Sequence, residues 1–347
     1  MNRKLGVILS VVACVVMAAP FLASADSSGG PVKGEMTFNI TVDTRPDNKD
    51  TRLWVPYPVS DQYQTIADVK IEGNFNNHGI YREKDGGAMI LYADWTAPIK
   101  EQKRLVLSFN VTAEERNRKN AAEVGDAIPA EVLQYLGETP SIPVGGKVGE
   151  IAKVATEGKK DIEGKARAAY DWVVDNTVRD PNVVGCGVGD VSATLAKKGG
   201  KCVDISSVFV SVARSAGVPA KEVFGIRLGK DEGVNDVTKG HHCWAEYYLP
   251  GTGWVPVDPA DVRKKILEDK IENDKAAVDK YRDFYFNGLD KYRISLSEGG
   301  RSLYLSPKQN DGPLNYFMYP YAEVDGKALE WLAAQKELKY TVTFKKS

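Results

Sequence analysis

The sequence predicts an α+β protein with helices packed on an antiparallel sheet, a β-sandwich before this core and a β-rich extension after it. Residues 36–111 contain short runs that alternate between apolar and polar residues and show no helical period. Residues 205–216 carry an apolar stripe at helix spacing. Strand-like runs at 241–249 and 254–258 are separated by Pro and Gly, as in an antiparallel hairpin. Helices followed by antiparallel strands are expected to form an α+β core.

Residues 1–25 have the pattern of a secretory signal peptide. Arg3 and Lys4 precede an apolar run, and small residues at 23–25 form a cleavage pattern. We therefore expect a periplasmic or secreted protein with no membrane span once the peptide is removed. Two alternatives remain open: an uncleaved membrane anchor, and a lipoprotein cleaved before Cys14.

The chain carries nearly equal numbers of basic and acidic residues. The chain has 46 basic and 47 acidic residues and a net charge of −1. Such a balance gives no reason to expect binding to nucleic acid or to an anionic membrane surface.

Three cysteines follow the signal peptide: Cys186, Cys202 and Cys243. An odd number in an oxidising compartment leaves at least one thiol free, as a catalytic cysteine requires. A bridge between Cys186 and Cys243 stays open, whereas a bridge that used Cys202 would block its chemistry.

A leader, a β-sandwich and a linker precede the core. Residues 26–34 are rich in Ser, Gly and Pro and are expected to form a flexible leader. Residues 35–113 are expected to form the β-sandwich domain, because short strands separated by turn residues are typical of it. Residues 114–146 begin with a charged stretch and are expected to form a linker with a short helix. The expected sandwich strands are 36–42, 51–55, 66–71, 88–92 and 104–111.

Residues 147–262 are expected to form the core. Helical periodicity at 148–156 and 162–176 predicts two helices. A third helix carries the apolar stripe at 205–216 and ends at Gly217 and Pro219. Cys202 lies at or near the N-terminus of that last helix. Free N–H groups and the helix dipole favour a thiolate there and lower the pKa of the thiol.

A strand at 221–228 and the hairpin after it are expected to form the core sheet. The hairpin turn brings its far ends together, so His242 and Asp258 are candidate neighbours. Adjacent residues on a strand face opposite sides, so only one of His241 and His242 can point at Cys202. The order Cys, His, Asp suits a nucleophile, a proton shuttle and an acid that orients the imidazole.

A metal site is the main alternative chemistry. Cys202, His241, His242 and Cys243 offer zinc-type ligands. Three consecutive residues on a strand cannot converge on one ion without breaking the strand, and the chain has no Cys-x-x-Cys pair. No acidic loop has the spacing of calcium ligands. We therefore expect neither a metal nor a cofactor.

Residues 263–347 are expected to form a C-terminal helix and a β-rich extension. A charged, helix-prone segment at 263–283 comes first. Strand-like runs follow, which either extend the core or form a terminal β-rich lobe. These runs are 292–296, 303–305, 314–319 and 338–344.

Three motifs together resemble the bacterial transglutaminase-like family, which belongs to the papain-like cysteine acyl-transfer group. They are Gly-Gly-Lys-Cys-Val-Asp at 199–204, His-x-Trp-x-Glu-x-Tyr at 242–248 and Gly-Trp-Val-Pro-Val-Asp-Pro at 253–259. The resemblance selects His242 over His241 as the base, with Cys202 as nucleophile. It makes Asp258 the orienting acid and leaves Asp261 as the alternative.

The resemblance implies an enzyme that acts on peptide or glutamine-type amide bonds through an acyl-enzyme. Hydrolysis is expected over crosslinking, and the expected partners are protein or peptide substrates, including cell-envelope peptides. The Cys202 N–H is one expected oxyanion donor, and Ser192 or Thr194 could supply a second. The alternative from another class is an inactive cell-envelope scaffold built on the same fold.

Overall fold

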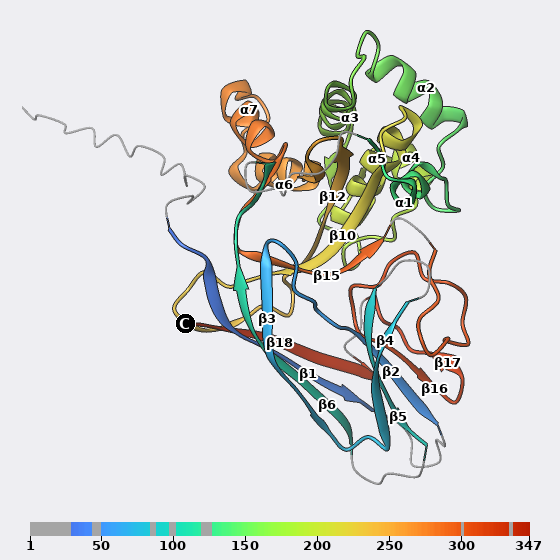
Figure 1. Ribbon diagram of the computed structural model, residues 1–347, viewed down its shortest axis with the longest axis vertical. Helices are drawn as coiled ribbons and strands as arrows, with labels where there is room; N and C mark the ends of the chain where they lie inside the picture. Colours follow the sequence, from blue (N-terminus) through green and yellow to red (C-terminus); the bar gives the residue numbers. More distant parts are fainter. Residues whose placement is uncertain are drawn as a thin grey trace, which may run out of the picture.

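The computed structural model describes residues 29–43, 50–83, 88–96, 102–118, 127–299, 302–332 and 336–347. The expected signal peptide lies outside these residues, as do the first three residues of the leader and part of the linker. Within the described residues the predicted α+β class is confirmed (Figure 1). None of the helices described there is both long enough and apolar enough to cross a bilayer.

The helices are α1 (Ala130–Leu133), the 3₁₀ helix η2 (Gln134–Leu136), α2 (Gly146–Ala155), α3 (Ile162–Asn176), α4 (Val191–Lys197), α5 (Cys202–Ser215), α6 (Pro259–Asp269) and α7 (Lys275–Phe284). The strands up to the core are β1 (Val32–Val42), β2 (Thr51–Pro56), β3 (Gln64–Gly73), β4 (Asn77–Arg82), β5 (Met89–Trp95), β6 (Lys103–Ala113) and β7 (Arg116–Asn117). The next strands along the chain are β8 (Val178–Arg179), β9 (Gly199–Gly200), β10 (Ala220–Arg227), β11 (Gly233–Asp236), β12 (His241–Leu249) and β13 (Gly253–Val257). The remaining strands are β14 (Gly288–Leu289), β15 (Arg293–Gly299), β16 (Tyr321–Val324), β17 (Lys327–Ala328) and β18 (Leu338–Lys346).

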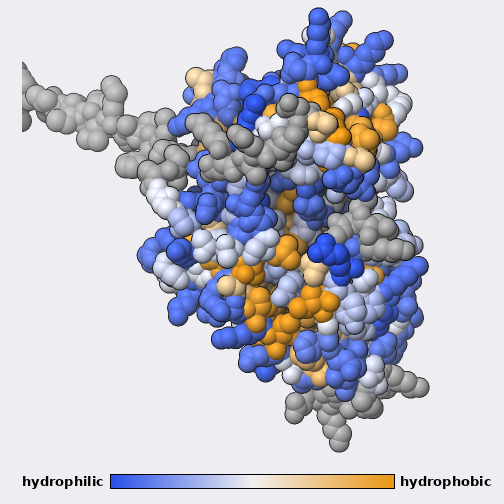
Figure 2. Space-filling model, viewed as in Figure 1, coloured by the Kyte–Doolittle hydropathy of each residue, from blue (hydrophilic) through white to orange (hydrophobic). Residues whose placement is uncertain are grey.

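Two antiparallel five-stranded sheets form the β-sandwich. Their strand orders are β11-β18-β1-β6-β3 and β17-β16-β2-β5-β4. Buried and exposed residues alternate along β1 and β6, as expected for strands with one face on a core. Phe38 and Phe109 stack between neighbouring strands, with ring centroids 6.3 Å apart. Figure 2 shows apolar residues gathered over the sandwich on one face, with hydrophilic residues around them.

The C-terminal strands pair with strands from earlier in the chain. β18 lies between β11 and β1, and β16 pairs with β2. β15 instead pairs with β10 in the core sheet. The segment after residue 263 therefore adds strands both to the core and to the sandwich.

The core is a four-stranded antiparallel sheet, β13-β12-β10-β15, with α5 packed against it (Figure 1). Nearly every residue of α5 is buried, because α2, α3, α4 and α6 surround the helix on its other sides. The register of β10 and β12 places Gly225 opposite His242. A Cβ at Gly225 would lie 2.0 Å from the Ile294 carbonyl oxygen, so glycine is what lets β15 approach here.

Candidate active site

Cys202 is the first residue of α5, as the sequence predicts. Asp204, two residues later, holds this helix end to the glycine-rich loop before it. Its Oδ2 accepts the Lys201 N–H at 3.0 Å, and its Oδ1 accepts the N–H groups of Val188 and Gly189 at 3.0 Å. Gly187 has φ of +97°, and a Cβ there would lie 2.1 Å from Asp204 Oδ2. The glycines of this loop therefore permit the close approach that fixes the start of α5.

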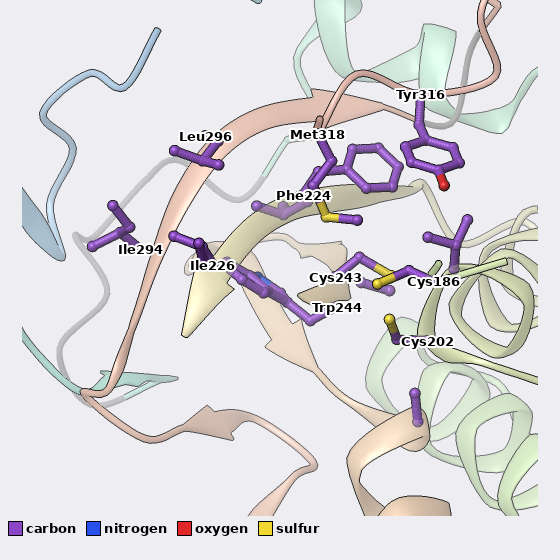
Figure 3. Packing of buried hydrophobic residues seen from close by; sticks show 14 of the residues in the cluster. Cys186, Cys202, Phe224, Ile226, Cys243, Trp244, Ile294, Leu296, Tyr316 and Met318 are labelled. Carbon is purple, nitrogen blue, oxygen red and sulfur yellow. The ribbon is translucent and has the colours of Figure 1, made fainter. Parts of the chain in front are cut away.

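All three cysteines that the structure describes are free thiols. The bridge between Cys186 and Cys243 that the sequence left open is therefore not formed. Cys186 and Cys243 lie next to Cys202, and their sulfurs gather around it (Figure 3). Cys186 Sγ also lies 3.3 Å from the His241 carbonyl oxygen, and the Cys186 carbonyl accepts the Val203 N–H at 3.0 Å.

Cys202 is the thiol in this cluster that is prepared to ionise. Hydrogen bonds from Cys186, Cys243 and His242 lower the pKa of Cys202 well below its usual value, although burial opposes them. The hydrogen bond to Cys202 and then burial raise the pKa of Cys186, and burial does most to raise that of Cys243. A proton leaving the cluster therefore comes from Cys202.

His242 lies between Cys202 and Asp258. Its Nε2 is 2.7 Å from Asp258 Oδ2, and because a carboxylate can only accept, Nε2 carries the hydrogen. Its other nitrogen, Nδ1, is then free to exchange a proton with Cys202. Burial and Arg227 lower the pKa of His242, but Asp258 and Asp261 raise it more, so the pKa lies above its usual value. The arrangement therefore favours an imidazolium beside a thiolate.

Asp258 has a different partner at each carboxylate oxygen. Oδ1 accepts the Asp261 N–H at 2.8 Å and caps α6, which begins at Pro259. Oδ2 accepts from His242 and, at 2.9 Å, from Arg293. The Asp-Pro pair that commonly starts a turn or helix therefore also orients the imidazole.

Asp261, the alternative acid, serves the arginines more than His242. Its Oδ1 lies 3.6 Å from His242 Nε2 and accepts from Arg227. Its Oδ2 accepts from Arg293 at 3.1 Å. Burial raises the pKa of Asp261, but Arg227, His242 and Arg293 together hold it well below its usual value. Asp258 is thus the better placed orienting acid.

His241 faces a different side of the strand from His242. Its Nδ1 lies 3.2 Å from the Thr238 carbonyl and its ring packs on Tyr319, with centroids 4.7 Å apart. Burial lowers the pKa of His241 to about 4, so the ring is neutral near pH 7. His241 also lines a cavity of about 780 Å³ next to the thiol cluster. The lining includes Gly185, Cys186, Lys201, Thr238, Tyr319 and Tyr340.

His242, Asp258 and Asp261 bring potential metal-ligand atoms within 4.8 Å of one another. Both carboxylates are already bound by guanidinium groups, from Arg293 and Arg227. A cation would have to displace these pairs, so the donor set does not suit a metal. The sequence prediction of no metal stays a prediction.

The two side chains proposed as oxyanion donors lie on α4. The Thr194 hydroxyl donates to the Asp190 carbonyl at 2.7 Å, within α4 and its cap. Ser192 lines a separate cavity beside Gly146 at the start of α2. Neither side chain lines the cavity next to the thiol cluster.

Sequence reasoning missed Arg293, which binds Asp258 and Asp261. Arg293 is completely buried on β15, where it falls in the predicted strand run 292–296. A buried strand rarely contains an arginine without a carboxylate partner, so a charged residue beside Ile294 could have signalled one. The sequence could not show which carboxylate that was.

Comparisons with known proteins show the family to which this fold belongs. The family model described as "Transglutaminase-like superfamily" matches residues 149–259. An uncharacterized protein of Haemophilus influenzae is 36% identical over 337 residues, or 89% of this chain and 90% of that protein. A protein-glutamine gamma-glutamyltransferase of Pseudomonas aeruginosa is 29% identical over 110 residues, or 30% of this chain and 16% of that protein. The crystal structure of a "Putative Cysteine Protease" from Cytophaga hutchinsonii covers 91% of this chain and 98% of its own, at 12% identity and a TM-score of 0.55, and is similar in fold alone.

Proposed function

Because the chain belongs to the transglutaminase-like superfamily, we propose that it is an exported cysteine enzyme that cleaves peptide or glutamine-type amide bonds. The family resemblance of the three sequence motifs is confirmed by these matches. The single observation that carries the proposal is the chain of contacts from Cys202 through His242 to Asp258 at the start of α5.

In the proposed reaction, the Cys202 thiolate attacks the amide carbonyl carbon. The developing oxyanion is stabilised by the Cys202 N–H and the positive end of α5. His242 then gives the proton on Nδ1 to the leaving amine, which leaves an acyl-enzyme on Cys202. In the second half, His242 removes a proton from the incoming water, and the thiolate is released. Asp258 keeps the imidazole in one tautomer throughout.

Substrate and location are part of the same proposal. The cavity of about 780 Å³ beside Cys186 has room for several residues of an extended peptide. We propose protein or peptide substrates, with cell-envelope peptides among them, and water as the preferred acyl acceptor. Sequencing the N-terminus of the protein recovered from the cell envelope tests export by a cleaved signal peptide: a chain that begins at Asp26 supports it, and one that retains residues 1–25 contradicts the cleavage.

A non-catalytic scaffold is the second candidate. Cys202 is only 2% exposed, and neither Ser192 nor Thr194 lies in the cavity next to it. A protein that only binds a partner through this fold would tolerate both features. The experiment below separates the two candidates.

The test is to trap the acyl-enzyme. Wild type and Cys202→Ala are mixed with a panel of peptide and glutamine-amide acyl donors and examined by intact mass, with and without a primary amine. A mass gain of one acyl group in wild type alone supports the proposal. Product formation by Cys202→Ala, or no adduct and no turnover with any donor, contradicts it and favours the scaffold. Transfer of the acyl group to the amine in preference to water would favour crosslinking.

A further inference from the structure

Arg293 lies where the proposed acid, Asp258, meets a wider charged cluster. Its side chain is completely buried, and it belongs to β15, beyond the end of the family match at residue 259. Nη1 donates to Asp258 Oδ2 at 2.9 Å, the same oxygen that accepts from His242. Nη2 donates to Asp261 Oδ2 at 3.1 Å and also to Asp290.

The carboxylates of this cluster outnumber its guanidinium groups. Three carboxylates, those of Asp258, Asp261 and Asp290, face two guanidinium groups, those of Arg227 and Arg293. One negative charge is left over on this side of His242, and it favours an imidazolium there. Uncompensated buried charge is costly, so the cluster as a whole favours the protonated imidazole.

The groups around His242 come from three elements. Asp258 and Asp261 stand at the start of α6, Arg227 on β10 and Cys202 on α5. Around Arg293, Asp290 precedes β15 and Tyr285 follows α7. Arg293 does not line the cavity next to the thiol cluster, and its shortest link to His242 is Asp258 Oδ2, which both side chains bind.

We propose that Arg293 is a positioning residue that, through Asp258, sets how firmly His242 holds its proton. The inference rests on the proposed function of Cys202, His242 and Asp258. Asp258 is held in place by the cap of α6 and by His242, so removal of Arg293 leaves its orientation fixed. What changes is its charge balance: without the guanidinium, the carboxylate binds the imidazolium more strongly. Arg293 thus keeps the imidazolium able to release its proton to the leaving amine.

The proposed role predicts that variants of Arg293 and Asp290 shift the loss of the His242 proton in opposite directions. Arg293→Met removes a positive charge from Asp258, so His242 should hold its proton to higher pH, by about one unit. Asp290→Asn removes a negative charge from Arg293, which is then free to offset Asp258 more fully. His242 should then lose its proton at lower pH, by about half a unit. Arg293→Lys keeps the charge and should lie near wild type.

The experiment measures the rate of Cys202 alkylation by iodoacetamide against pH, read by intact mass of the full chain. A thiolate and imidazolium pair gives two inflections that belong to the pair, and the upper one follows loss of the imidazolium proton. We expect the upper inflection to rise in Arg293→Met and to fall in Asp290→Asn. Arg263→Met, which removes another largely buried arginine that pairs with Glu272, should not move it.

If Arg293 has a purely structural role, Arg293→Met and Asp290→Asn both loosen the site and shift the upper inflection in the same direction. That result would overturn the inference. If Arg293→Met does not fold, Asp290→Asn still decides. Asp290 is a quarter exposed, and the carboxamide of Asn has the same shape as the carboxylate it replaces. An unchanged or raised upper inflection in Asp290→Asn overturns the inference. A single wild-type inflection near about 8.5 would mean that no ion pair exists, which overturns the proposed function and the inference with it.

Discussion

Replacing Asp258 by Asn tests whether its charge, and not only its shape, prepares Cys202. The amide has one acceptor and one donor where the carboxylate has two acceptors. If the amide oxygen takes the position of Oδ2, it keeps the bonds to His242 and Arg293 and loses the cap of α6, at about 1 kcal/mol. The opposite orientation turns an N–H₂ group toward His242 and Arg293 and loses two charge-assisted bonds of about 1.5–3 kcal/mol each. The first orientation should therefore prevail.

In that orientation the geometry survives and the charge is gone. Unit charges about 4 Å apart interact by about 4 kcal/mol at an effective dielectric constant of about 20. An interaction of this size is a large part of what keeps the pKa of His242 above its usual value. Asp258→Asn should therefore lower the pKa of His242 and raise that of Cys202, so the pH range in which thiolate and imidazolium coexist narrows from both sides.

The assay is again the rate of Cys202 alkylation against pH. We expect the lower inflection of Asp258→Asn to move up toward the free-thiol value of about 8.5 and the rate near pH 6 to fall by at least tenfold. Asp274→Asn is the matched control, because Asp274 caps α7 by accepting the Ala277 N–H at 3.0 Å, as Asp258 caps α6. Profiles of Asp258→Asn and wild type that coincide would refute the reasoning.

Two further predictions concern stability. Burial raises the pKa of Glu222 to about 7, while the Ser207 hydroxyl donates to its carboxylate at 2.6 Å. A carboxyl with a raised folded pKa is bound to its proton more tightly in the folded state, so stability falls as pH rises from about 4.5 to 7, by about 3 kcal/mol. Glu222→Gln should match wild type in denaturant unfolding at pH 5 and exceed it at pH 8, and an equal difference at both pH values would contradict this. Phe344 is fully buried on β18, between β11 and β1, so Phe344→Ala should lower the free energy of unfolding by about 3–5 kcal/mol. Lys345 is exposed on the same strand, and Lys345→Ala should change that free energy by less than about 0.5 kcal/mol. Equal effects would show that β18 does not contribute to the sandwich core.

Local patterns were enough to predict many elements. The apolar stripe of α5 and its Gly-Pro end placed Cys202 at a helix start, and alternation predicted the strands of the sandwich that have one buried face. β4 was not predicted, because its residues are almost all exposed and have no alternation to read. The hairpin gave His242 and Asp258 as neighbours because they are only 16 residues apart.

The amino-acid sequence by itself determined which faces of the chain are buried and which residue types stand at the start of α5 and at the ends of the hairpin. Only the tertiary structure decided which distant groups meet there: Cys186 against Cys202, Arg293 against Asp258, and β18 against β1. The reason is physical. Periodicity and capping are set by neighbours within a few residues, whereas a buried charge or an unpaired strand edge accepts any complementary partner. The packing of the whole chain selects which one it receives.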